Sequence, residues 1–244
     1  MNLKKILAFT LAEVLITLGI VGTVAAMTIP TLNYNRIKRE KTVRLKRFYS
    51  KMTNAIEAMN IDRPFRQMTA PSGTVAARDW YMENVDPYMG HKSARPTSSK
   101  HTSPAIFYND GSALKIIESR TSCVDVGYDT NGDKGPNLLG HDIFFFNFCF
   151  TDAGRMSHHN SKNDFFGPFT KRDGYYNSGH QVLIDEEDRI NINDSDFTRD
   201  VVLEECKQEP AACSKLLQMD DWEFKSDYPK SFPRDYQKFL KYKK

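Results

Sequence analysis

Hydrophobic residues dominate the chain up to residue 29 and become periodic after it. The stretch from Phe9 to Ile29 contains 21 residues, and Glu13 is its only charged residue. A helix of that length spans roughly 31 Å, which is close to the hydrocarbon thickness of a bilayer. The pattern therefore predicts a membrane-spanning helix over residues 9–29.

A different hydrophobic pattern follows Pro30. Apolar side chains recur at intervals of three and four residues, which is typical of an amphipathic helix. Pro30 lacks a backbone N–H and crowds the preceding turn, so we expect it to kink or loosen the helix. The residues that form or flank this stripe are Ile37, Lys41, Arg44, Leu45, Phe48, Tyr49, Met52, Ile56 and Met59. Together the two patterns predict one long helix from about residue 10 to residue 59, whose second half packs on a globular domain.

Short apolar runs separated by turn residues replace the helical pattern beyond residue 60. A short helix is expected near residues 75–88, and an Asn-Asp-Gly-Ser turn at residues 109–112 predicts a β-hairpin. The expected strands are 105–108, 113–117, 123–126, 143–150 and a further strand or hairpin that begins at Gln181. A long helix followed by a small antiparallel sheet is an α+β arrangement.

Two ordinary interpretations fit the N-terminal hydrophobicity alone. Lys4 and Lys5 precede the apolar stretch, which favours a cytoplasmic N-terminus. The stretch can then be an anchor that stays uncleaved. It can also be a secretory signal peptide that is cleaved after Ala26, where the preceding residues are small.

Glu13 separates these interpretations from a third. A carboxylate inside an apolar helix costs about 3 kcal/mol on insertion scales, and such residues usually have a partner. A cut just before Phe9 supplies one, because the new α-amino group is a cation at the same depth. Glu13 can then neutralise the terminal amine of its own or of a neighbouring subunit. Neither an anchor nor a signal peptide explains this residue.

The segment AFTLAEVLITLGIVG resembles the class III signal of type IV pilins and type II secretion pseudopilins. In that family a prepilin peptidase removes a short basic leader before a Phe, and the new terminal Phe is N-methylated. The resemblance places the cut between Ala8 and Phe9 and makes Glu13 the fifth residue of the mature chain. The residue before the cut is usually Gly, so Ala8 departs from the pattern and we expect less efficient processing.

The resemblance implies a division into three parts. These are a cleaved leader over residues 1–8, a pilin helix over residues 9–60 and a globular, pilin-like domain over residues 61–244. The implied function is that of a non-enzymatic structural subunit of a type II secretion pseudopilus or a type IV pilus, assembled by lateral packing of N-terminal helices. The implied partners are other subunits of this kind, the prepilin peptidase/methylase and an inner-membrane assembly platform. The subunit would wait in the inner membrane with its domain in the periplasm.

A second function remains open on the same anchor. Minor pilins at a filament tip act as adhesion or DNA-uptake modules. The polar stretches near residues 90–103 and 152–180, which are expected to be loops, suit such a role. Abundance separates the two functions, since a major subunit dominates sheared filaments and a tip subunit is present in few copies.

Composition and motifs argue against other classes of function. The net charge is +3 and falls to roughly +1 without the leader, so no nucleic-acid partner is expected. His158, His159 and His180 lack the spacing of metal-binding or catalytic histidines, and we expect them on the surface. No nucleophile-elbow, phosphate-binding or dinucleotide-binding motif occurs in the sequence. We therefore expect neither an enzyme nor a required cofactor.

Four cysteines are present, and the compartment expected for the domain is oxidising. Disulfides are therefore expected, and three connectivities exist. In one continuous helix Cys206 and Cys213 would lie about 10.5 Å apart, too far to bond, but Pro210 interrupts such a helix. A local Cys206–Cys213 bridge becomes feasible and leaves Cys123 with Cys149 on neighbouring strands.

The loop between the strands of the second pair carries a high density of oxygen ligands. Asp129, Asn131 and Asp133 alternate along it, and Asn137 and Asp142 follow. Hard oxygen ligands at this density suit Ca²⁺, although the spacing is not that of an EF-hand. A loop of Asx-turns that needs no ion explains the same residues, so both interpretations stay open.

Overall fold

The structure is a computed structural model, and it describes residues 10–96, 103–119, 122–159, 161, 163–170 and 198–229. The chain divides into two compact units, residues 1–40 and residues 41–244. Each unit is described by itself below. The strand or hairpin predicted from Gln181 lies outside the described residues.

Helix α1, Leu11–Asp62, is 52 residues long and runs through Pro30 without interruption. It ends three residues later than predicted, and it contributes residues 11–40 to the first unit and residues 41–62 to the second. In the second unit the predicted stripe is confirmed. Its buried members are Leu45, Phe48, Met52, Ile56 and Met59.

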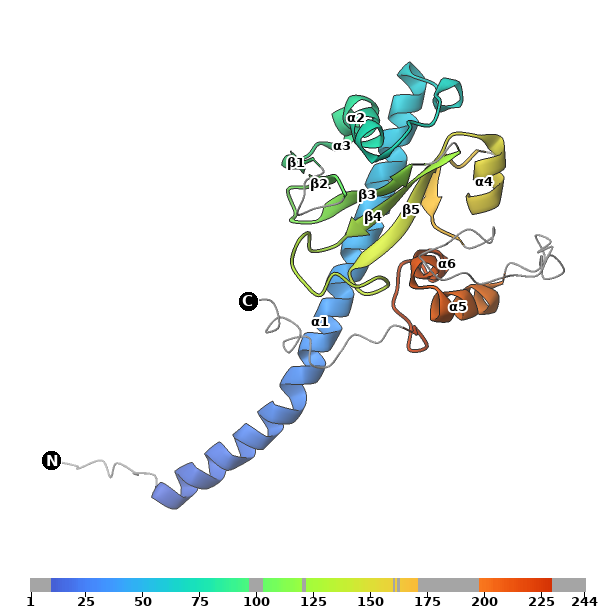
Figure 1. Cartoon of the computed structure of the whole chain (residues 1–244). Coiled ribbons are helices and arrows are strands. Elements are labelled where there is room, and N and C mark those ends of the chain that lie inside the picture. The colour runs from blue at the N-terminus through green and yellow to red at the C-terminus, as the bar shows by residue number, and fades with distance from the viewer. Residues whose placement is uncertain are drawn as a thin grey trace. The chain divides into compact units, whose positions relative to one another are not determined.

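The described residues of the second unit form a six-stranded antiparallel sheet in which the strands lie in chain order (Figure 1). The strands are β1 (Ser93–Arg95), β2 (Ala105–Phe107), β3 (Ala113–Ser119), β4 (Cys123–Asp129), β5 (Ile143–Cys149) and β6 (Phe166–Pro168). The predicted hairpin is β2–β3 and the predicted second pair is β4–β5, so both are confirmed. The α+β class is confirmed as well.

The sheet packs on α1 through aromatic side chains of its central strands. Alternation along β4 and β5 places Tyr128 and Phe146 on one face. Phe48 of α1 stacks on Tyr128 with 3.8 Å between ring centroids and meets Phe146 edge-on at 5.3 Å. On the other face a smaller cluster forms around Phe145, Phe169 and Ala211.

Short helices surround the sheet. They are η1 (Phe65–Gln67), α2 (Thr74–Asn84), α3 (Asp86–Met89), α4 (Asp152–His159), α5 (Arg199–Gln208), η4 (Pro210–Ala212) and α6 (Cys213–Met219). The helix predicted over residues 75–88 is therefore two helices, α2 and α3, separated at Val85. The residue that follows Asp86 in α3 is a proline, which is favoured in a first helical turn.

The two stretches predicted to be loops contain regular structure, which corrects that prediction. Strand β1 lies in the stretch 90–103, and both α4 and β6 lie in the stretch 152–180. Strands β1 and β6 are three-residue edge strands, too short to show alternation. Helix α4 packs closely against Cys123 at Gly154, where an added Cβ would meet Cys123 Sγ at 2.8 Å.

Basic side chains of α1 fasten the loops of the sheet to the helix. Each donates to a backbone carbonyl of a loop, and a carbonyl that is buried needs such a partner in place of water. The bonds run from Lys41 Nζ to His141 O (2.5 Å), from Arg44 Nη1 to Asp110 O (2.8 Å) and Thr130 O (3.0 Å), and from Lys51 Nζ to Met89 O (2.5 Å). Within the second unit, one face of α1 therefore packs in the hydrophobic core, and the basic residues beside that face bind the loops.

Both predicted disulfides are present. Cys123 and Cys149 face each other across β4 and β5 with a Cα–Cα distance of 4.1 Å. Cys206 and Cys213 are 4.5 Å apart, because α5 ends at Gln208 and the η4 turn that begins at Pro210 reverses the chain. The break at Pro210 acts as predicted.

The two disulfides should differ in their effect on stability. Replacing Cys123 and Cys149 together with Ser should lower the free energy of unfolding by about 3–4 kcal/mol, because that bridge spans 26 residues and restricts the unfolded chain most. The matched Cys206/Cys213 variant, with a span of 7, should lose about 2 kcal/mol. Urea unfolding of the detergent-solubilised chain measures both. A larger loss in the second variant would contradict this ranking.

Candidate assembly site on the N-terminal helix

The predicted cleavage site lies just before the part of the chain that the structure describes. Ala8 and Phe9 are outside the described residues, so the cut between them stays a prediction. The described part begins at Thr10, which directly precedes α1, and Glu13 lies in the first turn of the helix.

Glu13 forms a capping box with Thr10. Glu13 Oε2 accepts from the Thr10 backbone N–H at 2.8 Å and from the Thr10 hydroxyl at 2.9 Å. In return the Glu13 backbone N–H donates to Thr10 Oγ1 at 3.3 Å. This reciprocal arrangement satisfies donors that the first turn of a helix leaves without partners. Both side-chain bonds use Oε2, so Oε1 keeps its capacity to accept from a donor outside the helix.

Hydrophobic side chains cover the first part of α1 and are exposed within the described chain. Leu11 is 78% exposed, and Ile29, at the other end of the stretch, is 62% exposed. Residues of this first part form a helix long and apolar enough to cross a membrane. The helix and the two disulfides are features of a membrane-anchored or secreted protein.

The threonine hydroxyls of this segment donate to backbone carbonyls of the same helix. Thr17 donates to Glu13 O at 2.9 Å, Thr23 to Ile20 O at 2.9 Å and Thr28 to Val24 O at 2.9 Å. A helix whose hydroxyls bond to its own carbonyls meets the requirement for a lipid environment, where water is absent. The same property suits close packing against other helices.

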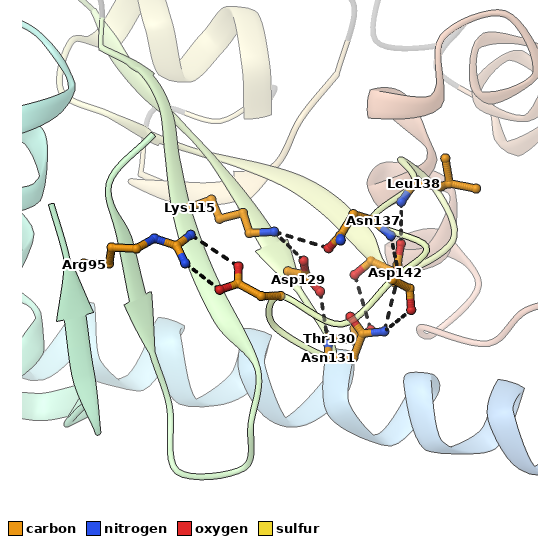
Figure 2. Close-up of polar contacts among 10 residues, drawn as sticks. Arg95, Lys115, Asp129, Thr130, Asn131, Asn137, Leu138 and Asp142 are labelled. Carbon is orange, nitrogen blue, oxygen red and sulfur yellow. Dashed lines mark hydrogen bonds and ion pairs between the residues drawn. The ribbon is translucent and has the colours of Figure 1, made fainter. Parts of the chain in front are cut away.

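The loop that joins β4 and β5 brings four of its five predicted ligands into one polar network (Figure 2). Asp129 Oδ1 accepts from the Asn131 backbone N–H at 3.1 Å. Asp142 Oδ2 accepts from the Asn137 backbone N–H at 2.9 Å and from Asn131 Nδ2 at 3.4 Å. Asn137 adopts a left-handed conformation, φ 55°, which Asn tolerates better than most residues.

Cationic side chains from two other strands already bind carboxylates of this loop. Lys115 of β3 donates to Asp129 Oδ2 at 2.6 Å, and Arg95 of β1 forms an ion pair with Asp133 at 2.5 Å. Burial raises the pKa of Asp129 to about 6, and Lys115 opposes that rise. Among the described residues no group of three or more His, Cys, Asp and Glu side chains is placed to hold a metal ion. The Ca²⁺ site stays a prediction, and an ion there has to displace Lys115 from Asp129.

The histidine prediction needs one correction. His158 and His159 end α4, and His159 is buried beneath β6, where its Nδ1 lies 2.5 Å from Asp164 O. Burial lowers the pKa of His159 to about 4, so the ring is neutral at physiological pH. The polar sequence around it did not reveal this burial, because Gly167 of β6, which packs against the His159 ring, lies eight residues later in the chain. His180 lies outside the described residues.

Three residues of these sites were missed from the sequence. Thr10 carries a readable signal, since Thr three residues before Glu at a helix start is the capping-box pattern. Lys115 and Arg95 carry no sequence signal of their roles, because their partners Asp129 and Asp133 lie far along the chain.

Comparison with known proteins places the chain in a family. Residues 31–232 match the model of a family of unknown function, DUF6613. The match covers well over half of the chain, which therefore belongs to this family. No curated protein and no solved structure was found to match. The matched region begins after Pro30, so the function of the first helical segment has to be argued from its own residues.

The calcium prediction is testable through Lys115. If Ca²⁺ binds the loop, millimolar Ca²⁺ at pH 7.5 should raise the Tm of the wild type, because Asp129 is ionised above about pH 6. Lys115→Met should respond more strongly, because the competing cation is gone. Lys207→Met, at an exposed lysine of α5, is the matched control. Unchanged Tm values in both the wild type and the Lys115 variant would refute the site.

Proposed function

We propose that this member of DUF6613 is a structural subunit of a filament of the pilin class, either a type II secretion pseudopilus or a type IV pilus. In this proposal a prepilin peptidase cuts the chain before Phe9 and the new amine is N-methylated. The apolar first part of α1 spans the inner membrane until it leaves to pack against the helices of neighbouring subunits. The proposal assigns the chain no enzymatic activity.

One observation carries the proposal. Glu13 is the only charged residue of the apolar stretch from Phe9 to Ile29, and it lies one turn from the expected new N-terminus. Its Oε2 is held by Thr10, which fixes the carboxylate at the helix end and leaves Oε1 for a cation at the same depth. The α-amino group of Phe9 on a neighbouring subunit is that cation. Such a pair neutralises two buried charges only when adjacent helices are in one register, so it selects how subunits stack.

The rest of the fold supports the proposal. A domain with two disulfides fits the oxidising side of the inner membrane. Apolar side chains exposed along residues 11–32 are a surface that must be covered by lipid or by other helices. In this proposal, lipid covers these side chains before assembly, and the helices of other subunits cover them in the filament core.

The mass of the mature N-terminal peptide tests the proposed processing. The chain should be expressed together with a prepilin peptidase, digested, and the N-terminal peptide identified by mass spectrometry. We expect a peptide that begins at N-methylated Phe9. A chain that begins at Met27, as a secretory signal peptide would leave, or at Met1 would refute the proposal.

Glu13→Gln and Thr10→Val separate the two roles of the Glu13 carboxylate. Gln at this position keeps the capping box but carries no charge, whereas Val at position 10 removes the capping hydroxyl and keeps the charge. We expect Glu13→Gln to be cut before Phe9 as usual and to fall at least tenfold in sheared filaments. Thr10→Val should be reduced much less.

The opposite result would assign Glu13 a different role. If Glu13→Gln assembles like the wild type and Thr10→Val does not, the carboxylate serves to cap the helix and the ion pair is wrong. Quantitative immunoblots of the sheared fraction, normalised to processed subunit in the membrane, measure both variants.

A further inference from the structure

Basic residues follow the apolar part of α1 and fall into two groups. They are Arg36, Lys38, Arg39, Lys41, Arg44, Lys46 and Arg47. In the second unit, Lys41 and Arg44 donate to loop carbonyls and Lys46 pairs with Asp221 at 2.7 Å. The first unit ends at Glu40, so Arg36, Lys38 and Arg39 belong to the helical segment that precedes the globular unit.

The side chains of this first group are available to a partner. Arg36 and Arg39 are exposed and lie three residues apart, hence on neighbouring positions of one helix face. Lys38 is half-buried and places its ammonium 5.5 Å from the centre of the Tyr34 ring. The segment from Thr31 to Arg39 contains no acidic residue and carries three positive charges.

The position of the group along the helix matches the headgroup layer of a bilayer. Tyr34 and Arg36 follow Ile29, the last residue of the apolar stretch, by about 7.5 and 10.5 Å of helix. A headgroup layer adds about 5–8 Å on each side of the hydrocarbon, so Tyr34 lies within it and the long side chains of Arg36 and Arg39 can reach back to it. A tyrosine at this depth is typical of membrane interfaces.

Orientation in the membrane does not explain these cations. Cations beside a span favour keeping that flank in the cytoplasm, yet the disulfide-bonded domain follows on this side. Arg36, Lys38 and Arg39 thus oppose Lys4 and Lys5, and the long domain crosses regardless of their charge. Three cations that oppose the orientation signal suit a binding partner of opposite charge.

We propose that residues 34–39 bind anionic phospholipid headgroups on the periplasmic face of the inner membrane, with Tyr34 at the interface and Arg36, Lys38 and Arg39 on the phosphates. This rests on the proposed membrane-inserted state of the helix. The site holds the inserted subunit at one depth. Extraction into a filament requires these lipids to be released.

Lipid selectivity of the reconstituted full chain tests the site. The wild type and the triple variant Arg36→Gln/Lys38→Gln/Arg39→Gln are placed in phosphatidylcholine bilayers that contain spin-labelled phosphatidylglycerol or spin-labelled phosphatidylcholine. The fraction of motionally restricted label gives the preference for the anionic lipid. We expect a preference in the wild type that falls by up to about fivefold for each cation removed. It should also disappear in 1 M NaCl, where charges are screened beyond about 3 Å.

A matched variant and an independent measurement separate the outcomes. Lys92→Gln/Lys134→Gln/Lys207→Gln removes three exposed charges from the globular unit and should keep the wild-type preference. Equal loss in this control, or no preference in the wild type, would overturn the lipid site. Binding of duplex DNA by the wild type but not by the triple variant, without lipid preference, would also overturn it. Alkaline extraction tests the membrane span separately, since release of the wild type would refute the proposed function.

Discussion

The contact between Phe48 and the sheet is the interaction on which the globular unit depends. This single ring stacks on Tyr128 of β4, meets Phe146 of β5 and Phe166 of β6 edge-on, and lies 6.4 Å from Tyr108 beyond β2. It therefore joins four parts of the sheet region to one position on α1. Because the ring is 4% exposed, its removal would leave a cavity against all of them.

Packing around Phe48 also determines where the loops lie. With the sheet fixed against α1, the turn after β2 and the loop after β4 come within reach of the helix. Arg44 bonds to a carbonyl of each, at Asp110 and Thr130. The loop that carries Asp142 is held in the same way by Lys41 through His141. The polar loop network in Figure 2 is thus a consequence of the hydrophobic contact as much as of its own sequence.

Much of this fold could be predicted from the sequence, because its signals are local. The period of the α1 stripe, the turn at residues 109–112 and the short apolar runs of β4 and β5 each depend on neighbours in the chain. The disulfides were predicted from Pro210, which breaks the helix between Cys206 and Cys213 and leaves Cys123 with Cys149 on neighbouring strands. The edge strands β1 and β6 were missed because their pairing partners, and not their own residues, make them strands.

The same distinction applies to the two candidate sites. The oxygen-rich loop could be recognised, but its charge balance could not, since Lys115 and Arg95 come from other strands. At the helix start, by contrast, the sequence contains everything that matters. Thr10 and Glu13 are three residues apart, and their reciprocal bonds follow from that spacing alone.

The capping box changes the energetic argument about Glu13. A carboxylate in an apolar helix is costly chiefly when its hydrogen bonds are lost. Thr10 returns two of them to Oε2 before any partner arrives, and it does so within the same helix. The cost that an ion pair must offset is therefore smaller than for an isolated carboxylate, which fits the proposed membrane-inserted state that precedes assembly. What the capping box does not provide is a positive charge, so the net charge of Glu13 still favours a cation at Oε1. In the proposed filament a neighbouring chain with a free terminal amine would supply it, whereas a chain that keeps its leader would not.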